Sequence, residues 1–204
     1  MSNFIQDTLL NHIMTVEVTL LIAAIIMVII GVRDGDKATY KLSVIGVIAL
    51  IFSFFFSFNG ADLSFGILPK FYNLDNFILT SRILVIFAAL VSLVLYIGHL
   101  NYNVKNRRME FPIIMVFSVI GMLIMLTSHD FLTFYIGLEL QSLAIYILVS
   151  INRANIKSAE AGLKYFILGA LGSGILLFGI SLIYGFSGSI FFKDIGEVLA
   201  SGYN

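Results

Sequence analysis

The sequence contains no cysteine and few charged residues. Without cysteine, the chain cannot form disulfides, bind a metal through thiolates or use a cysteine nucleophile. Its three histidines, His12, His99 and His129, are too scattered to predict a metal site. Charged residues make up 12% of the chain, against about 25% in ordinary soluble domains. Lysine plus arginine and aspartate plus glutamate are equal at 12 each, so the net charge gives no indication of a nucleic-acid partner.

Apolar side chains, by contrast, are abundant. Hydrophobic residues form 59% of the chain, and the mean hydropathy is +1.01. A single water-soluble core could not bury so many of them, so we expect lipid to surround most of the chain. The first eleven residues hold no lysine or arginine, and no small-residue cleavage site follows the first apolar run. We therefore expect that run to stay in the membrane rather than to be removed as a signal peptide.

Six apolar stretches are long enough to cross a hydrocarbon core of about 30 Å as helices. They occupy approximately residues 13–32, 42–58, 77–98, 112–127, 131–151 and 159–184. The last twenty residues, rich in glycine and serine, are expected to form a connection. The sequence thus predicts an all-α polytopic membrane bundle, with three leading helices in residues 1–110 and three further helices plus a connecting tail in residues 111–204.

The basic residues predict how this bundle is oriented, because short cytoplasmic loops carry an excess of lysine and arginine. Nine of the twelve basic residues follow the first, third and fifth predicted helices: Arg33, Lys37, Lys41, Lys105, Arg107, Arg108, Arg153, Lys157 and Lys164. Lys70 and Lys193 fall on the opposite side, and Arg82 lies within the third helix. We therefore predict that both termini lie on the non-cytoplasmic side.

Glu139 is the residue that most strongly indicates function. It is the ninth residue of the fifth predicted helix, so it should lie close to the middle of the bilayer. An ionisable group at a helix centre costs about 2.5 to 3.5 kcal/mol or more, so it needs a partner or a proton. Tyr135, Ser142 and Tyr146 fall on the same helix face as Glu139 and predict a polar stripe along a proton pathway. The alternative is a glutamate that bonds a neighbouring helix for assembly alone.

The sixth predicted helix begins with a pair of opposite charges. Lys164 follows Glu160 by four residues, which favours a stabilising surface pair, although Lys164 is also a candidate for the pathway. Ser158 is expected to cap the start of this helix. The dense glycines that follow, such as Gly169 and Gly172, predict close packing within a bundle.

The first and third predicted helices each contain a charge as well. Arg82 could extend toward the outer membrane surface or pair with Asp75, seven residues earlier on the same face. Glu17 falls in the first turn of the first predicted helix, where a carboxylate costs little, so we expect no special role for it.

Two sequence blocks resemble a known family. The blocks are DFLTFYIGLELQSL at 130–143 and SAEAGLKYF at 158–166, with GMLIM at 121–125 preceding them, and their Glu139 and Lys164 are 25 residues apart. They are similar to subunit N of the bacterial proton-pumping NADH:quinone oxidoreductase (respiratory complex I), the counterpart of mitochondrial NADH dehydrogenase subunit 2. The resemblance extends over the whole chain but is looser in the early helices, at Glu17 and at Asp75 with Arg82.

This resemblance implies a non-redox subunit of a translocase, in the membrane arm and in the bacterial inner membrane. NADH, FMN, iron–sulfur clusters and quinone would then be bound by partner subunits, and the chain's own partners would be other membrane-arm subunits and the lipid bilayer. In that family the glutamate matched by Glu139 pairs with a lysine on the seventh helix, and Lys164 matches a further channel lysine.

The chain departs from the family in length. Members usually have about fourteen helices, with two inverted five-helix repeats, whereas six are predicted here, before the seventh helix. The sequence therefore resembles an N-terminal portion. Two alternatives stay open: a component of a multi-subunit cation/proton antiporter, which shares both blocks, and a truncated membrane fragment without translocation of its own.

Overall fold

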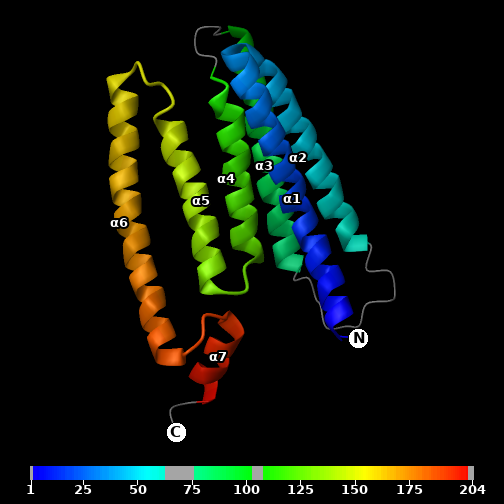
Figure 1. The fold of residues 1–204 in the computed structure, drawn as a ribbon, viewed down its shortest axis with the longest axis vertical. Helices are drawn as coiled ribbons and strands as arrows, with labels where there is room; N and C mark the ends of the chain where they lie inside the picture. The colour runs from blue at the N-terminus through cyan, green and yellow to red at the C-terminus, as the bar shows by residue number, and fades with distance from the viewer. Residues whose placement is uncertain (1, 63–75, 103–107, 202–204) are drawn as a thin grey trace.

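The computed structural model describes residues 2–62, 76–102 and 108–201, and their long elements are all α-helices (Figure 1). The helices are α1 (Ser2–Asp34), α2 (Thr39–Asp62), α3 (Asn76–Tyr102), α4 (Glu110–Thr127), α5 (Phe131–Val149), α6 (Ile156–Ser187) and α7 (Phe192–Ser201). A short 3-10 helix, η1 (Gly35–Ala38), joins α1 to α2. The predicted all-α class is confirmed.

Five stretches of the described chain are long and apolar enough to cross a membrane. The first, Val16–Ser57, is 42 residues long and runs through α1, η1 and α2. Figure 1 shows α1 and α2 lying side by side in opposite directions, so this stretch folds into two crossings. The other four stretches coincide with α3, α4, α5 and α6. The predicted set of about six transmembrane helices therefore corresponds to α1–α6.

Polar contacts hold together the end of the bundle at which η1 lies. The chain reverses at Gly35, whose φ of +61° lies in the left-handed region that favours glycine. The backbone N–H of Met109 donates to Asp36 Oδ1 at 3.1 Å, which ties this turn to the start of α4. Arg153 Nη2 lies 3.6 Å from Glu110 Oε1, which ties the α5–α6 connection to the same end. The described basic segments predicted to share one side of the membrane thus lie together, whereas Lys105 and Arg107 fall outside the described residues.

The core lies among α1, α2, α3 and α4. α1 and α3 each pack against both α2 and α4. Fully buried apolar side chains fill the space between these helices, among them Leu20, Met27, Leu50, Leu93 and Leu123. The predicted leading helices thus pack with α4 into one group, and α5 and α6 follow beside it in sequence order (Figure 1).

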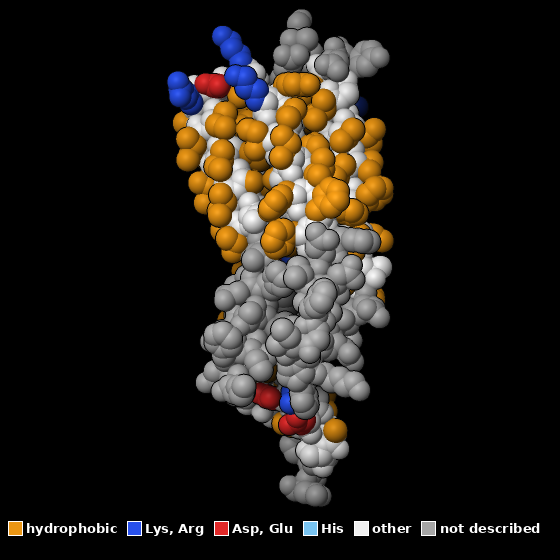
Figure 2. Space-filling model, turned by 90° about the vertical axis from the view of Figure 1, so that its right-hand side faces the viewer, with side chains coloured by type: hydrophobic (Ala, Val, Ile, Leu, Met, Phe, Trp, Pro, Cys, Tyr) orange, Lys and Arg blue, Asp and Glu red, His pale blue; other side chains and the backbone are white. Residues whose placement is uncertain are grey.

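The outward-facing side chains of this group are apolar too. Figure 2 shows a belt of hydrophobic side chains on one face, with lysine and arginine gathered at the end of the belt. Residues such as Ile29, Val32 and Phe55 are more than half exposed. In water this surface would be unstable, but it matches the hydrocarbon interior of a bilayer.

α6 packs mainly through the face that meets α5. A Cβ atom added at Gly162 would lie 2.5 Å from the Cβ of Ser150, and one added at Gly169 would collide with the ring of Tyr146. Close packing is therefore found at Gly169, as predicted, whereas a Cβ at Gly172 would meet no described atom within 4 Å. The helix begins earlier than predicted, because Asn155 rather than Ser158 caps it by accepting from the backbone N–H of Lys157 at 3.0 Å.

The expected connecting tail contains a helix, α7, which the sequence did not predict. The ring of Phe192 meets that of Phe131 edge to face, with centroids 4.8 Å apart. The backbone N–H of Phe192 donates to the carbonyl oxygen of His129 at 3.2 Å. Ile195, one turn further on, is buried. Apolar residues at helical spacing thus dock α7 against the start of α5.

Candidate functional site

The start of α5 is fixed by Asp130. Its carboxylate accepts hydrogen bonds from the backbone N–H of Thr133 at 2.8 Å and from the Thr133 hydroxyl at 2.7 Å. Partial burial acts to raise the pKa of Asp130, but these hydrogen bonds outweigh it and hold the pKa below its usual value. Asp130 is thus an anionic N-cap, which suits the positive end of the helix dipole.

Because α5 begins just after Asp130, the predicted polar stripe lies along the middle of this helix. Glu139 is the ninth of the 19 residues of α5, as expected from the sequence. Tyr135, Glu139, Ser142 and Tyr146 are all half-buried. Residues seven apart, such as Glu139 and Tyr146, lie on the same side of a helix. The stripe is therefore present as a geometric feature of α5.

Glu139 has a buried oxygen that lacks a hydrogen-bond partner. Within the described residues, nothing donates to Glu139 Oε1, although solvent does not reach this atom. A buried carboxylate in this state is costly, because its lost hydration is not replaced. Among the described residues, no group of three or more histidine, cysteine, aspartate or glutamate side chains could hold a metal ion. The carboxyl group of Glu139 can exchange a proton or pair with a cation.

Tyr146 connects the stripe to α6 and to a cleft. Its ring lies edge to face with Tyr165 and Phe166, at centroid distances of 5.0 and 5.7 Å. It also lines a cleft of about 520 Å³ between the start of α4, the end of α5 and the start of α6. Arg108, Glu110 and Arg153 line the same cleft. The stripe thus ends in a cleft with charged walls, at the basic end of the bundle.

Lys164 forms the predicted pair with Glu160. The two side chains are joined at 2.5 Å by a salt bridge and are 70% and 56% exposed. Gly162 faces Ser150 of α5, and Lys164, two residues further on, lies on nearly the opposite side of α6. The described structure therefore does not bring Lys164 to Glu139.

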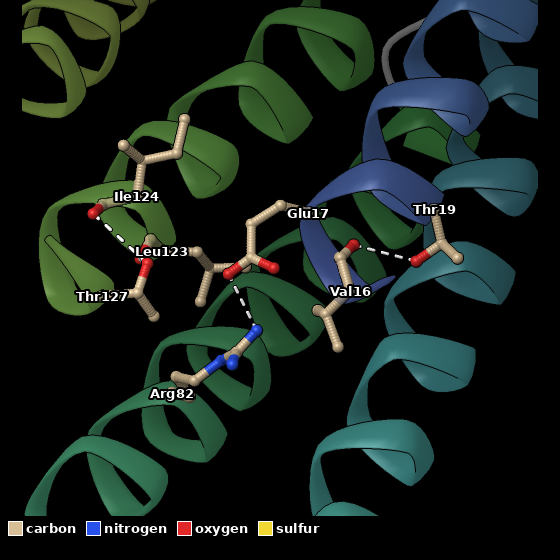
Figure 3. Close-up of polar contacts among 7 residues, drawn as sticks. All are labelled: Val16, Glu17, Thr19, Arg82, Leu123, Ile124 and Thr127. Atoms are coloured by element: carbon tan, nitrogen blue, oxygen red, sulfur yellow. Dashed lines mark hydrogen bonds and ion pairs between the residues drawn. The ribbon is translucent and has the colours of Figure 1, made fainter. Parts of the chain in front are cut away.

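Arg82 pairs with Glu17, for which the sequence predicted no special role. Arg82 Nη2 donates to Glu17 Oε1 at 2.8 Å (Figure 3), and the two side chains are only 7% and 13% exposed. The expectation that Arg82 extends to the outer surface is therefore wrong. Asp75, its other predicted partner, lies outside the described residues. Glu17 is not in a first turn, because α1 begins at Ser2 and continues well before it.

The pairing of Glu17 with Arg82 could have been anticipated from a weak signal. Both are lone charges of opposite sign, each within an apolar run and each near the end of its run away from the basic loops. Charges in such places are usually paired, because the membrane interior penalises an isolated one. Their separation of 65 residues in the chain hid the partnership.

Comparison with known proteins finds a related family model and a related fold. The family model described as "NADH:quinone oxidoreductase/Mrp antiporter, TM" matches residues 128–204, which include the Glu139 and Lys164 blocks. The helix arrangement also matches a solved structure, respiratory complex I from Thermus thermophilus with bound aureothin. The TM-score is 0.67 at 23% identity, covering 87% of this chain and 38% of that chain. At this identity the match to the solved structure shows the fold alone, an all-α membrane helix bundle.

Relatives of known name resemble the chain over most of its length. NADH-quinone oxidoreductase subunit N 1 of Rhizobium meliloti is 36% identical over 194 residues, covering 91% of this chain and 38% of the relative. Subunit N of Bartonella bacilliformis is 41% identical over 191 residues, covering 90% and 37%. These matches confirm the resemblance to NADH-quinone oxidoreductase subunit N, to which the chain is homologous over nine tenths of its length. The chain spans about two fifths of the length of these relatives.

Proposed function

We propose that the chain is part of a membrane-arm subunit that couples quinone reduction to proton translocation in an NADH:quinone oxidoreductase, with Glu139 as a buried charge switch. The names of its relatives support this reading, and so does the membrane fold. NADH, FMN, iron–sulfur clusters and quinone would be bound by partner subunits. This chain would contribute no redox group of its own and would sit in the bacterial inner membrane.

One observation carries the proposal: the buried, unpartnered Oε1 of Glu139 at the middle of α5. In its neutral form the carboxyl group tolerates this position, whereas its anion needs a cation nearby. A cation that approaches would therefore release the proton of Glu139, and a cation that withdraws would restore it. Glu139 would in this way convert movement of charge elsewhere in the assembly into uptake and release of a proton.

The polar stripe supplies the route to Glu139. Tyr135, Ser142 and Tyr146 carry hydroxyl groups that both donate and accept hydrogen bonds, as proton transfer along a chain requires. Tyr146 borders the cleft at the basic end. With that end on the cytoplasmic side, as the basic residues predict, protons would pass between the cleft and Glu139. Lys164 and Glu160 would act at the α6 side of this route. Within the described chain they do not contact Glu139, so they would sense its change of charge through long-range electrostatic interaction.

The second candidate is a component of a multi-subunit cation/proton antiporter. The description of the matching family model names both classes. The relatives at 36% and 41% identity are oxidoreductase subunits, which favours the first candidate. Proton translocation driven by NADH oxidation in inverted membrane vesicles would support the first, and sodium/proton exchange without NADH would support the second.

The test of the charge switch is Glu139→Gln. This variant keeps the shape of the side chain but cannot ionise, so we expect normal assembly with proton translocation reduced about 100-fold or more, in line with the roughly 10²–10⁴-fold contribution of positioned proton-transfer groups. Glu197→Gln on α7 is the matched control, because it removes the same charge from a side chain that is 71% exposed. Normal translocation by an assembled Glu139→Gln variant would exclude the switch.

A further inference from the structure

The ion pair of Glu17 and Arg82 lies inside a group of four helices rather than on a seam between two. Glu17 belongs to α1 and Arg82 to α3, and α1 and α3 each pack against both α2 and α4. Figure 3 shows Arg82 reaching from its helix to Glu17, with Thr127 of α4 nearby. The Thr127 hydroxyl already donates to the carbonyl oxygen of Leu123 at 3.0 Å. The Thr127 hydroxyl is therefore satisfied within α4, whereas Glu17 Oε2 accepts no hydrogen bond from the described residues.

The packing of α2 places Ser57 at the level of this pair. Gly46 of α2 lies between Met27 of α1 and Leu93 of α3: a Cβ atom there would be 3.5 and 3.1 Å from their side chains. α2 runs opposite to both neighbours. Eleven residues along α2 from Gly46 is Ser57, and eleven residues back along α3 from Leu93 is Arg82. Ser57 and Arg82 thus lie at the same depth.

Three buried oxygens lie at this depth or about one helical turn from it. Within the described residues, Glu17 Oε2, Ser53 Oγ and Ser57 Oγ have no hydrogen-bond partner. A helical serine can donate to the carbonyl four residues back, as Ser43 does to Thr39 at 2.8 Å, but Ser53 and Ser57 do not. Ser53 and Ser57 are four residues apart, so their hydroxyls lie on one face of α2, with Cβ atoms about 5–6 Å apart.

We propose that the leading helices enclose a water-binding site whose ligands are Glu17 Oε2 and the hydroxyls of Ser53 and Ser57. A buried water typically makes about three hydrogen bonds to otherwise unsatisfied groups, and this site supplies three. A water at about 2.8 Å from each of two hydroxyl oxygens, with a near-tetrahedral angle between the bonds, spans about 4.6 Å, and serine hydroxyls on Cβ atoms about 5–6 Å apart can turn toward each other to meet it. The water donates to Glu17 Oε2 and to one serine oxygen, and it accepts from the other serine.

Such a water would stabilise the ion pair of Glu17 and Arg82. It solvates the oxygen of Glu17 that Arg82 does not reach, so the carboxylate can stay charged inside the helix group. The charged carboxylate then holds Arg82, and α1 is fixed to α3 across α2. The site acts through hydrogen bonds in the leading helices and does not depend on the proposed role of Glu139.

Radiolytic hydroxyl labelling of the assembly in its own membrane tests this site. Radiation splits bound water, and the radicals oxidise side chains beside it even when bulk solvent does not reach them. Leu20 and Ile86 are fully buried at the level of Ser53, whereas Leu42 and Leu93 are equally buried nearer the basic end. We expect oxidation of Leu20 and Ile86 to exceed that of Leu42 and Leu93 several-fold.

A variant tests the ligands. In the double variant Ser53→Ala with Ser57→Ala, two of the three hydrogen-bonding groups are gone, so oxidation of Leu20 and Ile86 should fall to the level of the controls. Low oxidation of Leu42 and Leu93 in the variant would show that the helices remain packed. The proposal is overturned if Leu20 and Ile86 are oxidised no more than the controls in the unaltered chain, or if the double variant labels as strongly as the unaltered chain. The unaltered chain decides the matter even if the variant does not fold.

Discussion

Gly121 of α4 and Gly137 of α5 face each other where the backbones of the two helices touch. A Cβ atom at Gly121 would lie 2.8 Å from the carbonyl oxygen of Gly137, and one at Gly137 would lie 2.9 Å from that of Gly121. Because the opposing atoms are backbone, no side chain can move aside to make room. This contact fixes α5, and with it Glu139, two residues from Gly137.

Replacement of either glycine by alanine should separate the helices. We expect Gly137→Ala to lower the free energy of unfolding by about 1–3 kcal/mol, the usual cost of overpacking, measured by thermal unfolding in detergent or nanodiscs. Gly172→Ala is the control, because a Cβ there meets no described atom within 4 Å. That variant should gain up to about 1 kcal/mol from the helix propensity of alanine. Equal melting temperatures for Gly137→Ala and the unaltered chain would contradict the contact.

Removal of one partner of the buried ion pair of Glu17 and Arg82 should strongly lower the free energy of unfolding. Arg82→Met leaves Glu17 as an uncompensated buried charge, so we expect a loss of about 3–5 kcal/mol in the free energy of unfolding. Glu17→Met together with Arg82→Met should cost less than the sum of the single variants, because no charge is left unpaired.

The exposed pair of Lys193 and Glu197 is the control for this comparison of single and double variants. Their side chains are 86% and 71% exposed, so removal of either charge should change stability by no more than about 0.5 kcal/mol. Additive effects of Glu17→Met and Arg82→Met would mean that the two residues are not coupled.

Asp130 predicts a pH dependence at the start of α5. Its pKa is lower in the folded chain than in the unfolded chain, because hydrogen bonds from Thr133 outweigh the effect of burial. The stabilisation is thus fully present above the ordinary aspartate pKa of about 3.9 and is lost as the pH falls through the lowered folded value. Asp130→Asn still caps the helix but does not titrate in this range. The stability difference between the two chains should be constant near neutral pH and should shrink below about pH 4; a difference independent of pH down to 2 would contradict the assignment.

The absence of cysteine makes the orientation easy to test. Lys157 lies in the first turn of α6 and Lys193 lies in α7, just beyond the other end of α6, and each can be replaced by a single cysteine. In intact cells and in inverted vesicles, a membrane-impermeant maleimide should label Lys157→Cys from the cytoplasm and Lys193→Cys from outside, as the excess of basic residues predicts. The reverse pattern would invert the predicted orientation.

Lys164 allows stability and transport to be separated. Its bond to Glu160 is an exposed pair within one helix, so Lys164→Ala should change the free energy of unfolding by only about 0.3–0.5 kcal/mol. If Lys164 belongs to the proposed pathway, proton translocation should nevertheless fall several-fold. Lys193→Ala removes a lysine in a similar exposed pair and should leave translocation unchanged. Normal translocation by Lys164→Ala would remove Lys164 from the pathway.

The sequence predicted what depends on local spacing. Helices α1–α6 follow from apolar runs that must satisfy their backbone hydrogen bonds within lipid, and the Glu160–Lys164 pair follows from a separation of four residues. The pairing of Glu17 with Arg82 could not be read in this way, because it is set by how four helices pack. The sequence did not predict α7, because its ten residues lie in a stretch rich in glycine and serine. Its docking on Phe131 is a tertiary contact, which local spacing does not reveal.

The length of α6 has a consequence for how the chain is held in the bilayer. At 1.5 Å per residue its 32 residues span about 48 Å, which exceeds the hydrocarbon layer by about 18 Å. Glu160 and Lys164 lie in the first three turns, so this overhang is long enough for both charges to sit among the lipid headgroups. Sliding α6 one turn inward would drag them toward the acyl chains. The pair should therefore limit how far α6 can move into the hydrocarbon layer.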